Sequence, residues 1–225
     1  MPSLKPLVIV GNGEIAAIAD QYFTHDSDRT VAAFAIGAEY RNSETYLDRP
    51  LVELADLETA YPPSEYDAFV AIGDAQLNRV RKGHYEDLKA RGYGLASYVS
   101  SRAFVWRDVP IGDNCLILEN NVLQPFVTIG NNVTLWSGNH IGHRAVIEDH
   151  VFMASHAVVS GYVHIGAHSF VGVNAAFAHQ VKVAADNFIA MGAVISTSTQ
   201  PDTIYQGNPA EARKISAKRF CRVRE

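Results

Sequence analysis

The sequence has few cysteines, and this excludes a disulfide-stabilised protein. Only Cys115 and Cys221 occur among the 225 residues, and they form neither a CxxC pair nor another spacing typical of metal ligands. A disulfide framework is therefore not expected. We predict that both are free thiols in a reducing compartment.

The sequence also lacks a basic excess and a long hydrophobic run. Its formal net charge is -5 at pH 7, and only the tail Arg213–Arg224 is basic, whereas nucleic-acid-binding domains normally carry a basic face. No apolar stretch approaches the ~20 residues that span a membrane, and the start Met1–Lys5 leads directly into an apolar strand. We expect a cytoplasmic protein that binds neither nucleic acid nor membrane.

Residues 1–98 alternate between strand-like and helix-like segments, as in a βαβ domain. A helix is predicted at Glu14–Phe23, and strands are predicted at Leu7–Val10, Val31–Ile36, Asp67–Ile72 and Leu95–Val99. Asp74 is placed to N-cap a long helix that ends near Arg91, because its carboxylate can accept unpaired backbone N–H groups.

From residue 99 onward an apolar residue recurs at every sixth position. These anchors are Val99, Val105, Ile111, Ile117, Leu123, Ile129, Leu135, Ile141, Ile147, Met153, Val159, Ile165, Val171, Phe177, Val183, Ile189 and Ile195. The residue after an anchor is often Gly or Ala, which resembles the hexapeptide repeat. In that repeat three six-residue faces form a triangular coil of eighteen, and coils stack as parallel strands ~4.8 Å apart. The pattern predicts a β-helix over 99–200.

Two features follow from this stacking. Asn121 and Asn139 lie eighteen residues apart and are expected to form a ladder inside the β-helix. The repeat should stop near Pro201, and a turn at 207–210 should lead into a short capping helix, Glu211–Arg222, that covers exposed strand edges.

Seven of the nine histidines fall within residues 140–179. Stacking every eighteen residues places His143 in a column with Pro125, Gly161 and His179. It also places His150 and His168 above Asn132, and His156 between Gly138 and Asn174. For a histidine taken singly, a structural role is the ordinary explanation.

His143 differs because Gly161 is its neighbour in the next coil. Acyl transfer from a thioester needs a base near neutral pKa and a backbone donor for the oxyanion within one strand spacing. Since Gly161 has no side chain, a thioester can approach its N–H while His143 takes a proton from an amine or hydroxyl.

These features occur together in a known family. The stretches Asn139–Gly161, Ile189–Ser196 and Gly207–Ala210 resemble the sialic acid O-acetyltransferase and bacterial nucleotide-amino-sugar N-acetyltransferase family. The resemblance covers nearly the whole chain. It implies an α/β Rossmann-like nucleotide-sugar-binding domain (1–98), an all-β left-handed parallel β-helix acyltransferase domain (99–200), and a C-terminal turn and short helix (201–225).

The resemblance also implies site residues. His143 matches the general base, Gly161 matches the residue whose N–H holds the acetyl carbonyl, and acetyl-CoA would run past Gly161, Ala178 and Gly192 between two subunits of a homotrimer. No metal is expected. Arg144 stands where many members have an acid, and Phe152 where some have another histidine. The group that orients His143 is therefore open, and the candidates are Glu148, Asp149, Asn139 and a residue of a neighbouring subunit.

The turn Gly11-Asn12-Gly13 follows a strand and opens a helix, where backbone N–H groups favour phosphate. The resemblance implies that it binds the nucleotide of the substrate, and that Asp74 and Arg79 belong to the same site. A tight βα turn and a helix cap are the simpler explanations. Residues 37–39 depart from the family pattern, so UDP, GDP and dTDP all stay open.

The predicted function is N-acetylation of a nucleotide-linked amino sugar, a precursor of a surface polysaccharide or glycan. Direct attack is expected, since Cys115 occupies an inward position. Sugar O-acetylation is the alternative. A zinc enzyme like the gamma-type carbonic anhydrases would need a third histidine where Ala184 stands, although His143 and His179 have the right spacing. A non-catalytic β-helix scaffold is the remaining possibility.

Overall fold

The computed structural model describes residues 4–224, and the chain divides into two compact units. The first contains the chain up to Gly73 together with Gly83–Tyr98, and the second contains Asp74–Lys82 together with the chain from Val99 on. The prediction that the chain leads directly from Met1 into an apolar strand concerns, at Met1–Ser3, residues outside the described ones. Between residues 4 and 224 no helix is long and apolar enough to cross a membrane.

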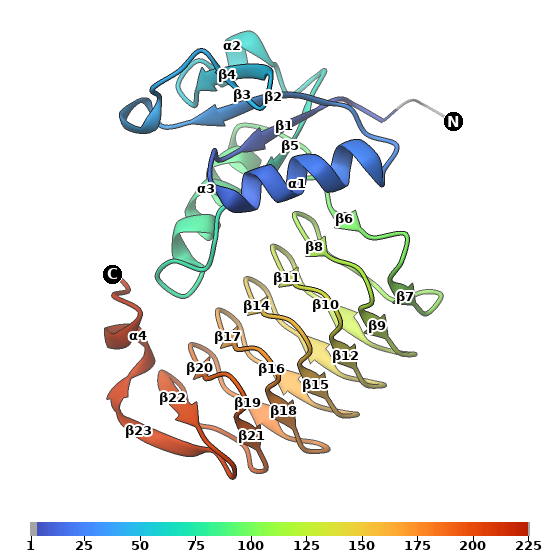
Figure 1. The fold of residues 1–225 in the computed structure, drawn as a ribbon, viewed down its shortest axis with the longest axis vertical. Coiled ribbons are helices and arrows are strands. Elements are labelled where there is room, and N and C mark those ends of the chain that lie inside the picture. Colours follow the sequence, from blue (N-terminus) through green and yellow to red (C-terminus); the bar gives the residue numbers. More distant parts are fainter. Residues whose placement is uncertain (1–3, 225) are drawn as a thin grey trace. The chain divides into compact units, whose positions relative to one another are not determined.

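The first unit is built on a five-stranded sheet with the order β3-β4-β2-β1-β5 (Figure 1). Its strands are β1 (Leu7–Val10), β2 (Val31–Ile36), β3 (Thr45–Tyr46), β4 (Arg49–Glu53) and β5 (Asp67–Val70). All neighbours pair in parallel except β3, which is antiparallel to β4 at the edge. The interior strand β1 is almost completely buried, as expected for a continuous apolar run covered on both faces.

The helical elements of this unit are short. They are α1 (Glu14–His25), the 3-10 helix η1 (Ala38–Tyr40), α2 (Leu57–Ala60) and the greater part of α3 (Arg79–Ala90). The predicted strands at Leu7–Val10 and Val31–Ile36 are confirmed, and the strand predicted at Asp67–Ile72 ends two residues early. The predicted strand at Leu95–Val99 is reduced to a bridge at Leu95 and β6 (Tyr98–Val99).

The predicted helix N-cap at Asp74 is wrong. The helix α3 begins only at Arg79, because Gln76, Leu77 and Asn78 all adopt left-handed backbone angles with φ of 56°, 50° and 66°. Such residues cannot continue a right-handed helix, and each costs about 1–2 kcal/mol. Leu77 and Asn78 are buried, so packing that the local sequence does not reveal holds this turn.

The second unit contains three parallel sheets of two-residue strands (Figure 1). One contains β8 (Leu116–Ile117), β11 (Thr134–Leu135), β14 (Phe152–Met153), β17 (Phe170–Val171) and β20 (Phe188–Ile189). A second contains β7 (Phe104–Val105), β9 (Val122–Leu123), β12 (His140–Ile141), β15 (Val158–Val159), β18 (Ala176–Phe177) and β21 (Val194–Ile195). The third contains β10 (Thr128–Ile129), β13 (Val146–Ile147), β16 (His164–Ile165) and β19 (Lys182–Val183).

The pairing register confirms the eighteen-residue coil. Thr134 pairs with Phe152, and His140 pairs with Val158, as do the other strands of each sheet. The anchors from Ile117 to Ile195 point inward and form one hydrophobic core. Each coil buries its anchors against its neighbours, so this unit is a parallel β-helix.

The predicted buried, structural role of Asn121 and Asn139 is confirmed, although each side chain bonds backbone groups and not the other asparagine. Asn121 and Asn139 are fully buried. The amide of Asn121 donates to the Leu118 carbonyl at 2.8 Å, and Oδ1 of Asn139 accepts the N–H of Ala157 at 2.8 Å. Both side chains therefore satisfy backbone groups at the turns, including groups of the adjacent coil.

The C-terminal prediction of a helix over Glu211–Arg222 is wrong in its first half. The chain forms β22 (Thr203–Gln206), which pairs with β20 and extends that sheet of the β-helix. It then forms β23 (Glu211–Ser216), which is antiparallel to β22. Only α4 (Ala217–Phe220) is helical. Pairing with the free edge of β22 overrides local helix propensity, since an uncovered edge leaves unpaired backbone groups.

Candidate active site

His143 lies at the corner that connects β12 to β13. Its side chain is exposed, and its backbone N–H donates to Oε1 of Gln124 in the preceding coil at 2.8 Å. Its carbonyl accepts the N–H of Tyr162 in the following coil at 2.9 Å. The position of His143 is therefore fixed by hydrogen bonds to the coils on both sides.

The structure brings His143 and Gly161 into contact. A Cβ atom on Gly161 would lie only 2.6 Å from Nε2 of His143, a separation that real Cβ contacts do not show. The imidazole therefore rests directly on the backbone at position 161. Only glycine permits this approach without displacing the ring.

The backbone N–H of Gly161 is unpaired at this contact, where the residue is buried beneath the imidazole. Across residues 4–224 it has no hydrogen-bond acceptor, whereas the equivalent N–H of His143, one coil earlier, is occupied by Gln124. A free backbone donor beside an imidazole is the pair that acyl transfer from a thioester requires.

Two further rings surround His143. The Tyr162 ring meets it edge-on with centroids 5.4 Å apart, and His179 lies 6.2 Å away in the coil beyond. Tyr162 and His179 also contact each other at 5.5 Å. His179 was expected here from the eighteen-residue column, whereas Tyr162 was not, although its place one residue after Gly161 could have indicated it.

The three side chains considered for orienting His143 have other partners. Glu148 contacts Nε2 of His164 at 2.5 Å, Asp149 accepts the N–H of Asn131 at 2.7 Å, and Asn139 accepts the N–H of Ala157. Among the described residues none bonds the His143 ring. The sequence left one further possibility for orienting His143, a residue of a neighbouring subunit.

Three solved structures share the architecture of the chain. A variant of perosamine N-acetyltransferase from Caulobacter crescentus, in complex with CoA and GDP-perosamine, superposes with a TM-score of 0.83 at 22% identity, over 93% of this chain and 97% of that one. The acetyltransferase domain of PglB from Neisseria gonorrhoeae gives 0.83 at 21% identity, over 93% and 100%. WeeI from Acinetobacter baumannii gives 0.66 at 20% identity, over 92% and 99%.

The chain has the fold of a bacterial sugar acetyltransferase. A family model of the bacterial transferase hexapeptide (six repeats) matches residues 108–141 and 127–161, which include both His143 and Gly161. No curated protein matches the sequence. The resemblance inferred from the hexad pattern and from His143 with Gly161 is thus confirmed at the level of fold.

Of the two other residues predicted to contact CoA, one lies in the coil that follows Gly161. Ala178 comes directly after β18, and two residues later Gln180 donates its N–H to the Gly161 carbonyl at 3.1 Å. Gly192 lies at another corner, between β20 and β21, where it is exposed with φ of 67°. In the acetyltransferase fold these residues therefore belong to different edges of the β-helix.

The Gly11-Asn12-Gly13 segment, which was predicted to bind phosphate, forms a tight turn between β1 and α1 in the first unit. Gly11 has φ of 131°, and a Cβ atom there would lie 2.7 Å from the Ala71 carbonyl oxygen, so glycine is required. Asn12 connects it to Gly13, whose carbonyl accepts the N–H groups of the first turn of α1. The turn therefore leads directly into the N-terminus of a twelve-residue helix.

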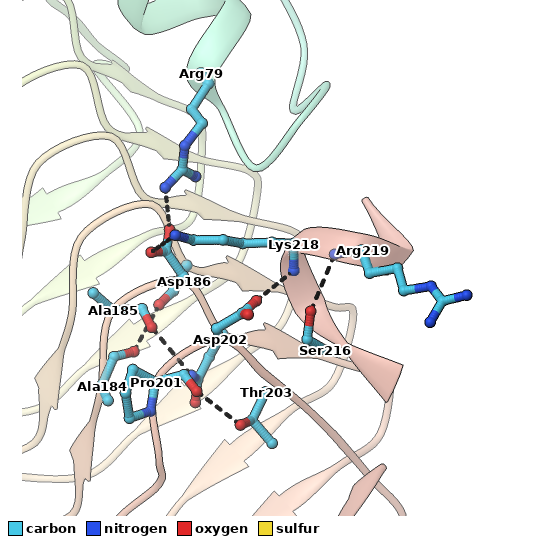
Figure 2. Close-up of polar contacts among 12 residues, drawn as sticks. Arg79, Ala184, Ala185, Asp186, Pro201, Asp202, Thr203, Ser216, Lys218 and Arg219 are labelled. Carbon is cyan, nitrogen blue, oxygen red and sulfur yellow. Dashed lines mark hydrogen bonds and ion pairs between the residues drawn. The ribbon is translucent and has the colours of Figure 1, made fainter. Parts of the chain in front are cut away.

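Asp74 and Arg79 belong to the second unit. Nη2 of Arg79 binds Oδ1 of Asp186 at 2.7 Å, and Nζ of Lys218 lies 3.7 Å from the other oxygen (Figure 2). The second Nη of Arg79 is buried and unpartnered among the described residues. The sequence did not indicate Asp186 as a partner, because 107 residues separate it from Arg79.

A zinc site is not supported by the side chains present. Among residues 4–224 no three His, Cys, Asp or Glu side chains are grouped so that they could hold a metal ion. His143 and His179 approach each other, but Ala184 occupies the position expected for a third ligand. Three protein ligands are the usual requirement of catalytic zinc.

Proposed function

We propose that this protein is an acetyl-CoA-dependent N-acetyltransferase acting on a nucleotide-linked amino sugar. The observation that carries the proposal is the imidazole of His143 lying on the bare backbone of Gly161, with the Gly161 N–H unoccupied among the described residues. Structures with the same fold support it, since one binds CoA with GDP-perosamine and another binds acetyl coenzyme A.

The geometry supports direct transfer. His143 takes a proton from the sugar amine as its nitrogen attacks the thioester carbonyl, and Gly161 donates its N–H to the developing oxyanion. The carbon–nitrogen bond forms, the carbon–sulfur bond breaks, and His143 returns the proton to the departing thiolate. Cys115 takes no part, because it is fully buried in the core and its thiol donates to the Gly130 carbonyl at 3.1 Å.

The first unit would act as a Rossmann-like nucleotide-binding domain. Asn12 and Gly13 supply backbone N–H groups at the start of α1, which favours a diphosphate, whereas Gly11 allows the tight turn and donates its own N–H to the Ala35 carbonyl at 2.9 Å. Asp74 and Arg79 are proposed as further contacts to the nucleotide sugar. Acetyl-CoA is proposed to pass Gly161, Ala178 and Gly192 between two subunits.

A homotrimer of left-handed β-helices would complete the site. The outward face of the second sheet carries exposed apolar side chains, Phe104 at 53% and Val158 at 48%. Such a face favours a partner surface, and a neighbouring subunit could supply the group that orients His143. Neither Cys115 nor Cys221 forms a disulfide, which fits a cytoplasmic protein.

The test is thiol release from acetyl-CoA with a panel of UDP-, GDP- and dTDP-linked amino and hydroxy sugars. We expect turnover with an amino sugar and a loss of about 10²–10⁴-fold in kcat for His143→Ala. A matched control is His164→Gln, which removes an imidazole on another face and should retain activity within about threefold. Acylation of hydroxy sugars only would make the protein an O-acetyltransferase. Full activity of His143→Ala, or no turnover with any acceptor, would refute the proposal and favour a scaffold.

A further inference from the structure

Arg144 lies in an aromatic column beside His143. Phe126, Arg144 and Tyr162 occupy the same position in three successive coils, and all three have left-handed backbone angles with φ of 67°, 59° and 60°. The guanidinium carbon lies 4.4 Å from the centre of the Phe126 ring and 5.8 Å from that of Tyr162. Two aromatic rings therefore hold this cation, each within the range of a cation–π contact.

The charge of Arg144 is not neutralised within the chain. Among the described residues it has neither an ion pair nor a side-chain hydrogen bond. The rings beside it remain open to solvent, since Phe126 is 67% exposed and Tyr162 is 47% exposed. A preformed cation with unused N–H donors thus stands at an accessible corner.

The two rings beside Arg144 limit what it can bind. The guanidinium carbon lies over the Phe126 ring, and no N–H of the guanidinium is bonded among the described residues, so its hydrogen-bond donors remain available for a ligand. A flat anion with two oxygens meets such an edge through two parallel hydrogen bonds. Lysine would supply the charge but not this fork.

The location of Arg144 relates it to the reacting atoms. It follows His143 directly in the chain, and the Tyr162 ring contacts both the guanidinium and the His143 imidazole, the latter at 5.4 Å. The guanidinium and the base therefore share the Tyr162 ring as a neighbour. We expect a substituent of the acceptor sugar, or the far end of a short acyl group, to reach from His143 to Arg144.

We infer that the site selects a reactant that carries a carboxylate close to the reacting centre, and that Arg144 binds this carboxylate. The inference rests on the proposed function, since it specifies the substrate of the same site. The carboxylate belongs either to the acceptor, as in an amino sugar with an acid at carbon 6, or to the acyl group, as in a dicarboxylic acyl-CoA.

The experiment compares two reactant pairs. One pair is a nucleotide-linked amino sugar and its 6-carboxylate analogue, both with acetyl-CoA. The other is acetyl-CoA and succinyl-CoA, both with the neutral amino sugar. For the wild type we expect kcat/KM to be about 10- to 100-fold higher for the carboxylate member of one pair, the effect of a charge-assisted bidentate contact. The pair that shows the preference identifies the source of the carboxylate.

Variants assign the preference to Arg144. In Arg144→Gln the ratio within that pair should fall to about 1, and in Arg144→Lys it should be intermediate, because charge remains without the fork. Arg102→Gln is the matched control, an exposed arginine at another corner, and should keep the wild-type ratio. Dissociation constants of the two sugar nucleotides and the two acyl-CoA compounds, measured by calorimetry, give the same ratios without turnover.

The outcomes separate the two proposals. Turnover without a carboxylate preference, or a preference that Arg144→Gln retains, overturns this inference and leaves the acetyltransferase proposal standing. If Arg144→Gln lowers kcat/KM equally for both members of each pair, the inference is also overturned, since such a result indicates that Arg144 contacts a phosphate or lies in an interface. If no acceptor is acylated, the proposed function fails, and the calorimetric ratios then decide whether Arg144 binds a carboxylate.

Discussion

At the scale of single residues, position 161 is where the side chain of His143 meets the backbone. Gly161 is needed there because a β-carbon would overlap the imidazole, and not because of an unusual backbone conformation. A substitution at this position therefore acts on the site and spares the fold.

Gly161→Ala should lower kcat by about 10²–10³-fold, because the methyl group displaces His143 and obstructs the N–H proposed as oxyanion donor. Steady-state thiol release checks this, with circular dichroism to show that the fold is kept. Gly83→Ala is the control, since nothing lies within 4 Å of a Cβ atom there. Equal activities of the two variants would show that contact with Gly161 is irrelevant to turnover.

At the scale of elements, one corner of the β-helix carries a polar column. Asn114 donates to Asn132 at 2.8 Å, the amide of Asn132 lies 3.0 Å from Nδ1 of His150, and His150 stacks on His168 with centroids 4.9 Å apart. Burial, together with the nearby His168, Lys82 and Arg81, lowers the pKa of His150 to about 4 despite Asp149. The column is therefore built for a neutral imidazole.

This pKa predicts acid sensitivity. Between about pH 6.5 and pH 4 the unfolded chain binds a proton at His150 that the folded chain does not, so stability falls as pH falls through this window. Above about pH 6.5 the titration of His150 does not lower the free energy of unfolding, whereas by pH 4 it lowers that free energy by up to about 3 kcal/mol. His150→Asn keeps a partner for Asn132 and should flatten this dependence. Urea unfolding at pH 7.5, 5.5 and 4.5 measures the free energy of unfolding. The same change of this free energy with pH in the wild type and the variant would contradict its assignment to His150.

At the scale of the whole molecule, the exposed apolar face of the second sheet predicts self-association. Val158→Glu places a charge in the middle of this face and should give a monomer with little acetyltransferase activity but an intact fold. Sedimentation equilibrium measures the mass. Val173→Glu, at another corner and 40% exposed, should assemble like the wild type. A monomeric wild-type protein that is fully active would exclude a shared site.

Prediction from sequence succeeded where one physical rule repeats along the chain. The anchors from Ile117 to Ile195 fall on the inward side of successive coils, and the column that joins His143 to Gly161 follows from the same eighteen-residue register. It failed at Gln76–Asn78 and at Glu211–Ser216. In both segments distant contacts overrule local preference, since a left-handed turn is buried in one and a sheet edge is covered in the other.

The hexad by itself determined the β-helix, the inward core and the neighbours of each corner residue, because stacking at a constant period converts sequence spacing into spatial distance. Only the tertiary structure decided which polar groups were still available. It showed Asp186 bound to Arg79, the carboxylates of Glu148 and Asp149 engaged elsewhere, and Arg144 between two rings. Partners of side chains depend on rotamers and on residues far away in the chain, and a local period contains no information on either.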